Sequence, residues 1–128
     1  MRVSRPSPAT AARALGAVLL VTGVTHFARP GIYRDLIPPA LPGSAGAWVY
    51  ASGVGELTCA ALLVVPRTRR LGGYAAALLL VGVLPGNAWM AWEWRDRSTV
   101  EQLIAYGRLP LQVPLIAWAL YCARRAPG

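Results

Sequence analysis

Histidine, cysteine and acidic side chains are scarce in this chain, whose 128 residues include one histidine, two cysteines and five acidic residues. A single histidine excludes a multi-histidine haem or metal site built by one chain. Cys59 and Cys122 lie far apart without a Cys-x-x-Cys motif, so we expect buried, inert cysteines and no thiol relay. Glycine-rich phosphate loops and nucleophile elbows are also missing. The sequence therefore contains no catalytic signature and no metal site, and it leaves enzymatic activity open.

Lysine is absent, and all thirteen basic residues are arginines, which set a net charge of +8. Such a charge can indicate nucleic-acid binding, but here the arginines cluster at the ends of apolar stretches. The positive-inside effect and anionic lipid headgroups explain that placement, so we expect the lipid bilayer as a partner and no nucleic acid. With 55% hydrophobic residues and a mean hydropathy of +0.44, the chain is too apolar for a soluble domain of this length.

Long apolar runs predict an all-α integral membrane four-helix bundle with up-and-down threading. The expected spans are residues 10–28, 44–65, 71–92 and 108–122. They form one membrane domain, 14–123, between basic tails at 1–13 and 124–128. Pro85 is expected to kink the third span, and residues 93–107 to include a short surface-lying helix.

Arginine placement predicts that both termini face the cytoplasm. The basic tails and the turn at 67–70 would share that side, whereas the outer loops balance arginine against acidic residues. The first twenty-eight residues also have features of a signal peptide. His26 and Phe27 fit a cleavage site poorly and further spans follow, so we expect a retained first helix. The proline-rich loop 29–42 should lie at the headgroups, with Tyr33 at the interface.

Glu56 is the only charged residue between Ser44 and Val65. At about 1.5 Å per residue it lies roughly 18 Å into the second span, near the middle of the bilayer. A carboxylate at that depth is costly unless it faces the bundle interior and finds a partner, so it indicates a ligand, proton or quinone role. A structural bond to Arg108 or His26 is the alternative. Helical periodicity assigns to its face Val49, Ser52, Gly53, Cys59, Ala60 and Leu63.

Other polar residues fall at the outer ends of the expected spans. With Glu56 they are predicted to line an outward-facing ligand pocket: His26, Asn87, Arg108 and Gln112, with Thr22 one turn before His26. Each also has a structural interpretation. His26 would be an interfacial histidine, and Arg108 would extend to the headgroups. Asn87 would hydrogen-bond to the backbone that is interrupted at Pro85, and Gln112 would bridge two helices.

Several short motifs make the chain similar to the DoxX family of small four-helix membrane proteins. They are His26-Phe27 with Pro30, the Ile37-Pro38-Pro39-Ala40-Leu41-Pro42 loop, Ser52-Gly53-Val54-Gly55-Glu56, Pro66-Arg67-Thr68-Arg69-Arg70, Pro85-Gly86-Asn87 and Arg108-Leu109-Pro110-Leu111-Gln112. The resemblance implies a four-helix membrane bundle. That family takes its name from a membrane subunit of a thiosulfate:quinone oxidoreductase, and other members are associated with redox complexes in bacterial membranes. The resemblance brings no catalytic residue set.

The leading hypothesis is a small multi-pass subunit of the bacterial inner (plasma) membrane that docks a redox-complex protein or a quinone-like hydrophobic molecule at Glu56. A looser resemblance to other four-helix membrane proteins supports an alternative, a protein that binds or isomerises a sterol-like lipophile. The third hypothesis is a structural or assembly subunit without a ligand. No cofactor is identified beyond the quinone that the resemblance suggests. The oligomeric state stays open, because rows of small residues also serve association between chains.

Overall fold

The computed structural model describes residues 6–34 and 37–126. Residues 1–5 and 127–128 of the expected basic tails lie outside the described residues, as does Asp35 of the outer loop. The described part is helical and contains no strand. Its elements are α1 (Pro8–Ala28), α2 (Gly31–Arg34), α3 (Ala45–Val64), the 3-10 turn η1 (Pro66–Thr68), α4 (Arg69–Gly82), α5 (Leu84–Glu93) and α6 (Thr99–Arg124).

Serine side chains begin the three longest helices. Ser7, Ser44 and Ser98 each accept a hydrogen bond from a backbone N–H in the first turn of α1, α3 and α6, which satisfies a donor that the helix itself leaves free. Because Ser7 caps α1 ahead of Pro8, this helix starts earlier than expected. Residues 8–13, expected as part of a basic tail, are therefore helical.

The third expected span is divided, and the fourth is longer than expected. α4 ends at Gly82 and α5 begins at Leu84, with Pro85 in its first turn, so the kink predicted at Pro85 is confirmed. α6 runs without a break from Thr99 to Arg124 although it contains Pro110 and Pro114. The short surface-lying helix expected within 93–107 is therefore wrong as a separate element, because its residues form the first turns of α6.

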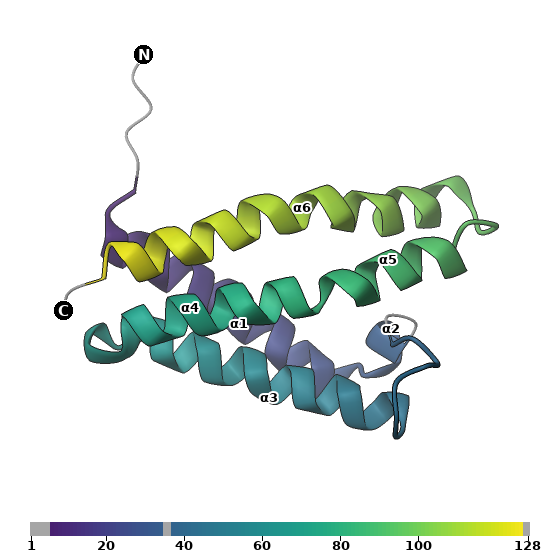
Figure 1. Ribbon diagram of the computed structural model, residues 1–128, viewed down its shortest axis with the longest axis horizontal. Helices are drawn as coiled ribbons and strands as arrows, with labels where there is room; N and C mark the ends of the chain where they lie inside the picture. Colours follow the sequence, from purple (N-terminus) through teal and green to yellow (C-terminus); the bar gives the residue numbers. More distant parts are fainter. Residues whose placement is uncertain (1–5, 35–36, 127–128) are drawn as a thin grey trace, which may run out of the picture.

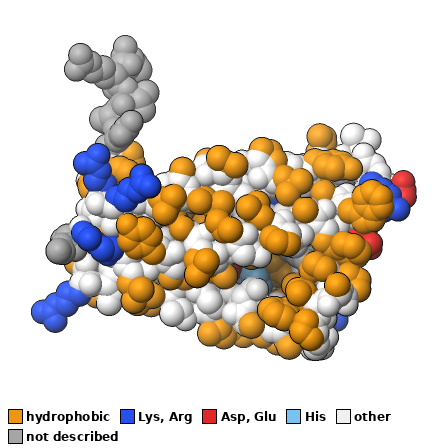
Figure 2. Space-filling model, viewed as in Figure 1, with side chains coloured by type: hydrophobic (Ala, Val, Ile, Leu, Met, Phe, Trp, Pro, Cys, Tyr) orange, Lys and Arg blue, Asp and Glu red, His pale blue; other side chains and the backbone are white. Residues whose placement is uncertain are grey.

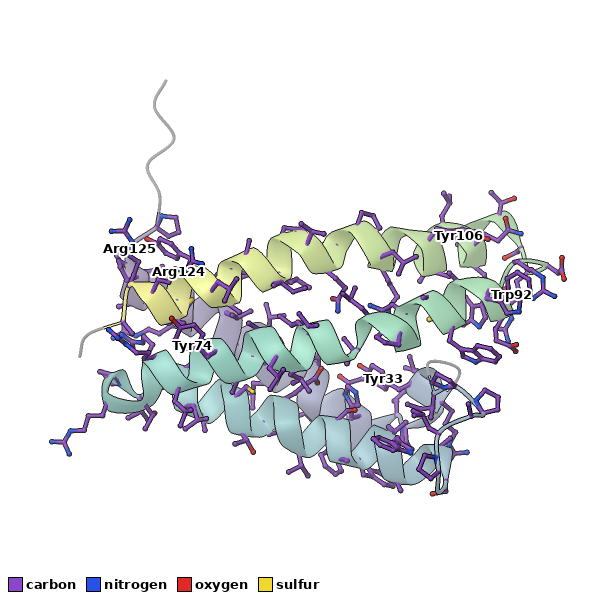
Figure 3. The ribbon with its side chains drawn as sticks, viewed as in Figure 1. Tyr33, Tyr74, Trp92, Tyr106, Arg124 and Arg125 are labelled. Carbon is purple, nitrogen blue, oxygen red and sulfur yellow. The ribbon has the colours of Figure 1, made fainter. Side chains whose placement is uncertain are left out.

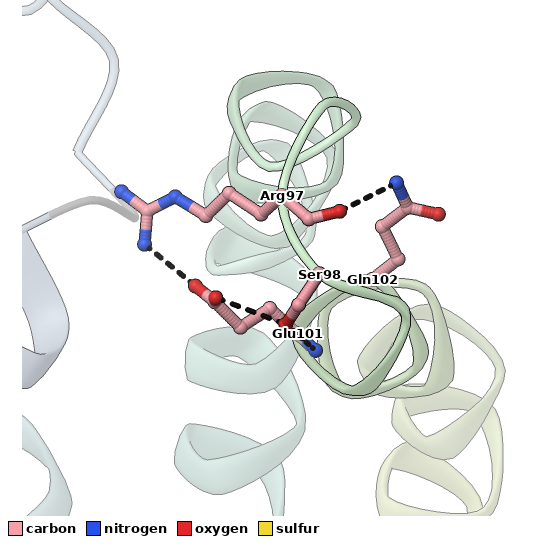
Figure 4. A network of polar contacts seen from close by, with 4 residues as sticks. All are labelled: Arg97, Ser98, Glu101 and Gln102. Carbon is pink, nitrogen blue, oxygen red and sulfur yellow. Dashed lines mark hydrogen bonds and ion pairs between the residues drawn. The ribbon is translucent and has the colours of Figure 1, made fainter.

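A small polar network closes the turn between α5 and α6 (Figure 4). Arg97 Nη1 donates to Glu101 Oε2 at 3.2 Å, and the Ser98 hydroxyl donates to Glu101 Oε1 at 3.0 Å. The side-chain amide of Gln102 donates to the backbone oxygen of Arg97 at 2.9 Å. Charged residues that the sequence assigned to an outer loop therefore hold the start of α6.

The helices lie side by side in an elongated molecule (Figure 1). α1 packs against α3, α3 against α4, and α4 against α6, which also contacts α1. Two side chains of α6 bind the start of the chain: Trp118 Nε1 donates to Ala11 O at 2.9 Å, and the Tyr121 hydroxyl donates to Pro6 O at 3.1 Å. The start of α1 and the end of α6 consequently lie at the same end of the molecule, and α2 lies at the other (Figure 1).

Within residues 6–34 and 37–126, four helical segments are long and apolar enough to cross a membrane: Pro8–Ala28, Ala45–Val64, Pro66–Glu93 and Thr99–Arg124. Figure 2 shows hydrophobic side chains over the middle of the visible face, a group of basic side chains without acidic ones at one end, and acidic side chains together with basic ones at the opposite end. Arg124 and Arg125 mark the basic end in Figure 3. The fold is therefore that of a multi-pass helical membrane protein, in agreement with the four spans expected from the sequence.

Arg69 has a structural role that the sequence interpretation missed. It belongs to the basic turn 67–70, yet it is only 4% exposed. Its Nε donates to Leu63 O at 2.9 Å and its Nη2 to Val64 O at 3.3 Å. These are carbonyls of the last turn of α3, which have no partner within the helix. Arg69 therefore caps α3 and does not serve only as a headgroup contact.

Candidate functional site

Glu56 lies on the face of α3 that is turned into the molecule. Its side chain is 15% exposed. The other buried residues of α3 are Val49, Gly53, Cys59, Ala60 and Leu63. All five belong to the face predicted for Glu56 from helical periodicity, and Ser52, the sixth, is half-buried. The prediction of an inward-facing carboxylate is thus confirmed.

Close approach of α1 and α3 brings His26 to Glu56. A Cβ added at Gly53 would lie 2.8 Å from the Cβ of His26, and one at Gly23 would lie 3.3 Å from the Cβ of Glu56. The distance at Gly53 is too short for any side chain, and a Cβ at Gly23 would also lie only 2.9 Å from Leu57, so both glycines permit the close approach of the two helices. The predicted small residues around Glu56 therefore have an identified use, since they let a histidine at the end of one span face a carboxylate inside another.

His26 is buried, and the hydrogen on its Nδ1 is directed to its own helix. Nδ1 lies 2.6 Å from the carbonyl oxygen of Thr22. Since a carbonyl oxygen can only accept, Nδ1 must carry the hydrogen of that bond. The same nitrogen lies 3.2 Å from Glu56 Oε2, close enough for an ion pair when the ring is protonated. In the neutral ring, Nε2 is left as an acceptor.

Glu56 Oε2 is a buried oxygen without a hydrogen-bond partner among the described residues. The 3.2 Å distance to His26 Nδ1 meets an ion-pair criterion, but the single hydrogen of that nitrogen is already donated to Thr22. Buried polar atoms in folded proteins nearly always have partners, and an exception needs a reason such as a ligand, an ion or a water. This oxygen is therefore an open acceptor inside the membrane-spanning part of the chain.

Arg108 and Tyr33 complete the surroundings of the carboxyl group. The charge of Arg108 acts on both Glu56 and Tyr33, whereas the Thr22 hydroxyl donates to Leu19 O of its own helix at 3.3 Å. Arg108 Nη1 also contacts Met90 Sδ at 3.8 Å. One arginine thus balances the charge of one carboxylate, which reduces the cost of keeping both within the bilayer.

Tyr33 covers His26 from outside the spans. Its ring stacks on the imidazole with the centroids 3.7 Å apart and the planes 13° from parallel. It projects from α2, which lies toward the end of the molecule opposite the chain termini (Figure 1), and its side chain is labelled in Figure 3. Sequence reasoning expected Tyr33 only as an interfacial residue, because no periodicity in a proline-rich loop indicates which way a side chain points. Its stacking on His26 is a property of the tertiary structure.

Asn87 and Gln112 are buried, with exposed fractions of 4% and 5%. Their hydrogen bonds lie near the break between α4 and α5. The backbone N–H of Asn87 donates to Val83 O at 3.0 Å, and Gln112 Nε2 donates to Leu80 O at 2.9 Å. Leu80 lies in the last turn of α4. Gln112 therefore bridges α6 to α4, as its structural interpretation proposed. Of the expected site residues, only His26 lies within ion-pair distance of Glu56 among the described residues, whereas Arg108 acts on it through its charge.

Two clefts among the described residues lie away from Glu56. One, of about 280 Å³, is lined by residues of α6 from Ala117 to Arg125, and the other, of about 360 Å³, lies between α1 and α3. At the carboxyl group, His26 Nδ1 lies 3.2 Å from Oε2, and the Tyr33 ring stacks on the His26 imidazole. The described residues also contain no group of three or more His, Cys, Asp or Glu side chains placed to hold a metal ion.

Burial and the negative charge of Glu56 raise the pKa of the Tyr33 phenol above its ordinary value of 10.0, while Thr25 and Arg108 act in the opposite direction. The folded chain thus holds this proton more tightly than the unfolded chain does. The resulting stabilisation is complete below pH 10.0 and is lost as the pH rises through the higher folded value. We expect the difference in tyrosinate absorbance between wild type and Tyr33→Phe to show a midpoint above 10.0. A midpoint at or below that value would contradict the buried, stacked position.

Four apolar helices around a buried carboxylate, histidine and arginine define a small helical membrane protein with a polar centre. A family model described as a domain of unknown function (DUF8561) matches residues 15–123. The match covers most of the chain, which therefore belongs to the DUF8561 family. No curated protein and no solved structure was found to match it.

Proposed function

We propose that this chain is a DoxX-like inner-membrane subunit of a bacterial redox or quinone-linked complex, and that Glu56 binds the polar end of a hydrophobic small molecule. The observation that supports the ligand is the buried Oε2 of Glu56, which has no hydrogen-bond partner among the described residues. The sequence motifs shared with DoxX proteins support the redox setting. The subunit acts by holding a lipophile in the membrane, next to the protein that exchanges electrons with it.

The chemistry of the site indicates the kind of group that would bind. Oε2 of Glu56 and, in the neutral ring, Nε2 of His26 are acceptors, so the ligand should present a hydrogen-bond donor such as a hydroxyl group. Arg108 supplies a cation that compensates the carboxylate when the ligand is uncharged. A quinol, which has two hydroxyl groups, meets this requirement better than a quinone, which has only carbonyl acceptors.

The orientation belongs to the same proposal. An up-and-down bundle with both termini in the cytoplasm follows from the positive-inside effect, because Arg13, the 67–70 turn, Arg124 and Arg125 occupy one end. At the other end, arginine and acidic side chains pair, as Arg97 does with Glu101. His26, two residues from the end of α1, and α2 then face the outer side of the membrane, from which a partner subunit would reach the site.

Native mass spectrometry of the chain extracted gently from its own membrane tests the ligand. We expect a bound lipophile in the wild type, its loss in Glu56→Gln, and its retention in Glu93→Gln, which removes an exposed carboxylate from the end of α5. Retention of the lipophile by Glu56→Gln, or unchanged quinone-dependent electron transfer in membranes, would contradict the proposal.

A structural or assembly role is the second candidate, and the dense packing around Glu56 favours it. Tyr33 stacks on His26, Gln112 binds the end of α4, and the two clefts lie elsewhere. Under this candidate, Glu56→Gln lowers the stability of the chain and changes no ligand content. A copurifying protein without any small molecule would make the chain a docking subunit and would exclude the ligand at Glu56.

A further inference from the structure

A groove between α1 and α3 runs from the basic end of the molecule toward its middle. It has a volume of about 360 Å³ and is lined by Arg13, Gly16, Ala17, Leu20, Leu57, Ala60, Ala61 and Val64. The two helices are antiparallel here, since Gly16 faces Val64 and Ala60 while Gly23 faces Leu57. From Arg13 to Leu20 the groove follows about seven residues of helix, or roughly 10 Å.

The groove exists because small residues line its floor. A Cβ at Gly16 would lie 3.1 Å from Val64 Cγ1 and 3.4 Å from Ala60 O, so α1 and α3 are close together there. Ala17 and Ala61 are exposed and too short to fill the space above this contact. The result is an apolar furrow on the surface of the spans, in which a linear hydrocarbon chain would be contacted from both sides.

Arg13 is the one charged residue in the lining, and it lies at the end of the groove near the membrane surface. Among the described residues Arg13 has no acidic neighbour within ion-pair distance, whereas other arginines are occupied, such as Arg69 by the end of α3 and Arg70 by Ala126 O. The acidic side chains outside the spans lie at the opposite end of the molecule (Figure 2). Arg13 therefore offers a positive charge directly above an apolar groove.

We propose that this groove is a binding site for an anionic phospholipid, with one acyl chain between α1 and α3 and the headgroup phosphate on Arg13. The combination of a cation and an apolar furrow of helical length matches the two parts of such a lipid. The site is separate from Glu56, whose carboxyl group is on the inner face of α3. Binding here holds α1 against α3 and depends on headgroup charge, which distinguishes it from the general contact of a span with lipid.

Reconstitution into nanodiscs that contain equal amounts of phosphatidylglycerol and phosphatidylcholine, followed by native mass spectrometry, tests this site. We expect wild type to retain phosphatidylglycerol preferentially, and Arg13→Gln to reduce that preference about tenfold, the equivalent of about 1.4 kcal/mol. Ala61→Leu, which fills the groove from an exposed position, should reduce retention of the lipid. Arg67→Gln is the matched control, because it removes the same charge from an exposed site at the same end but outside the lining.

Equal retention of the two lipids by wild type would overturn the proposal, as would equal losses in Arg13→Gln and Arg67→Gln, which would indicate general attraction to the basic end. Unchanged retention in Ala61→Leu would place the lipid outside the groove and would also overturn it. The same experiment separates this proposal from the proposed function at Glu56. Glu56→Gln should remove the lipophile at Glu56 and leave phosphatidylglycerol retention in the groove unchanged.

Discussion

Replacing Gly73 by alanine is expected to destabilise the folded chain by about 1 to 3 kcal/mol, the usual cost of forcing an extra group into a packed interior. A Cβ at this position would lie 2.6 Å from the backbone nitrogen and 2.7 Å from the Cβ of Ala123, and 2.8 Å from the carbonyl oxygen of Ala119. Backbone atoms cannot move aside as the end of a flexible side chain can, so α4 and α6 must separate. The lost packing outweighs the gain of about 1 kcal/mol in helix propensity that alanine offers over glycine.

Thermal unfolding in detergent, followed by tryptophan fluorescence, measures this effect. Gly82→Ala is the matched control, because it makes the same change in the same helix at a position where a Cβ would meet nothing within 4 Å. We expect Gly82→Ala to unfold at the wild-type temperature or slightly above it. Equal stabilities of the two variants would show that α4 and α6 are farther apart than described, and would contradict the close contact at Gly73.

Replacing Gly53 by alanine is expected to lower stability by a similar amount and, in addition, to abolish retention of the lipophile proposed at Glu56. The added Cβ would lie 2.8 Å from both the Cβ of His26 and Cε2 of Phe27. α1 would have to move away from α3 at the level where His26 Nδ1 now lies 3.2 Å from Glu56 Oε2. The geometry of the site would therefore change although none of its polar groups is removed.

Gly46→Ala provides the control for this second variant, since it lies in the first turn of α3 with nothing within 4 Å of an added Cβ. The comparison with Gly73→Ala is equally informative. Gly73 packs α4 against α6 and should affect stability alone, whereas Gly53 should affect stability and ligand retention together. If Gly53→Ala retains the lipophile at the wild-type level, the close contact of α1 and α3 is not required for binding.

Many features of the fold were predictable because a membrane strongly restricts which backbone conformations can span it. Backbone polar groups in hydrocarbon must bond within their own segment, so long apolar runs can only be helices. The break near Pro85 followed from a missing backbone donor. The continuous α6 was not predicted, because Pro110 and Pro114 suggested a shorter segment, whereas the membrane-spanning helix tolerates both.

The candidate site was predictable only in part. The inward direction of Glu56 followed from helical periodicity, since the small and apolar residues of its face were visible in the chain. Tyr33 and Arg69 were not identified as interior residues, because both lie in connections, where spacing does not determine the direction of a side chain. Gln112 had two interpretations, and its bond to Leu80 O supports the structural one.

The sequence by itself determined that the chain is an all-helical membrane protein with four spans and a single carboxylate within the second, because hydrophobic length, proline and charge act locally. Only the tertiary structure decided which groups surround that carboxylate. His26, Tyr33 and Arg108 come from three different helices, and the distance of His26 from the carboxylate depends on how closely α1 and α3 approach. That distance is set at Gly23 and Gly53 by contacts between segments far apart in the chain, which no local pattern specifies.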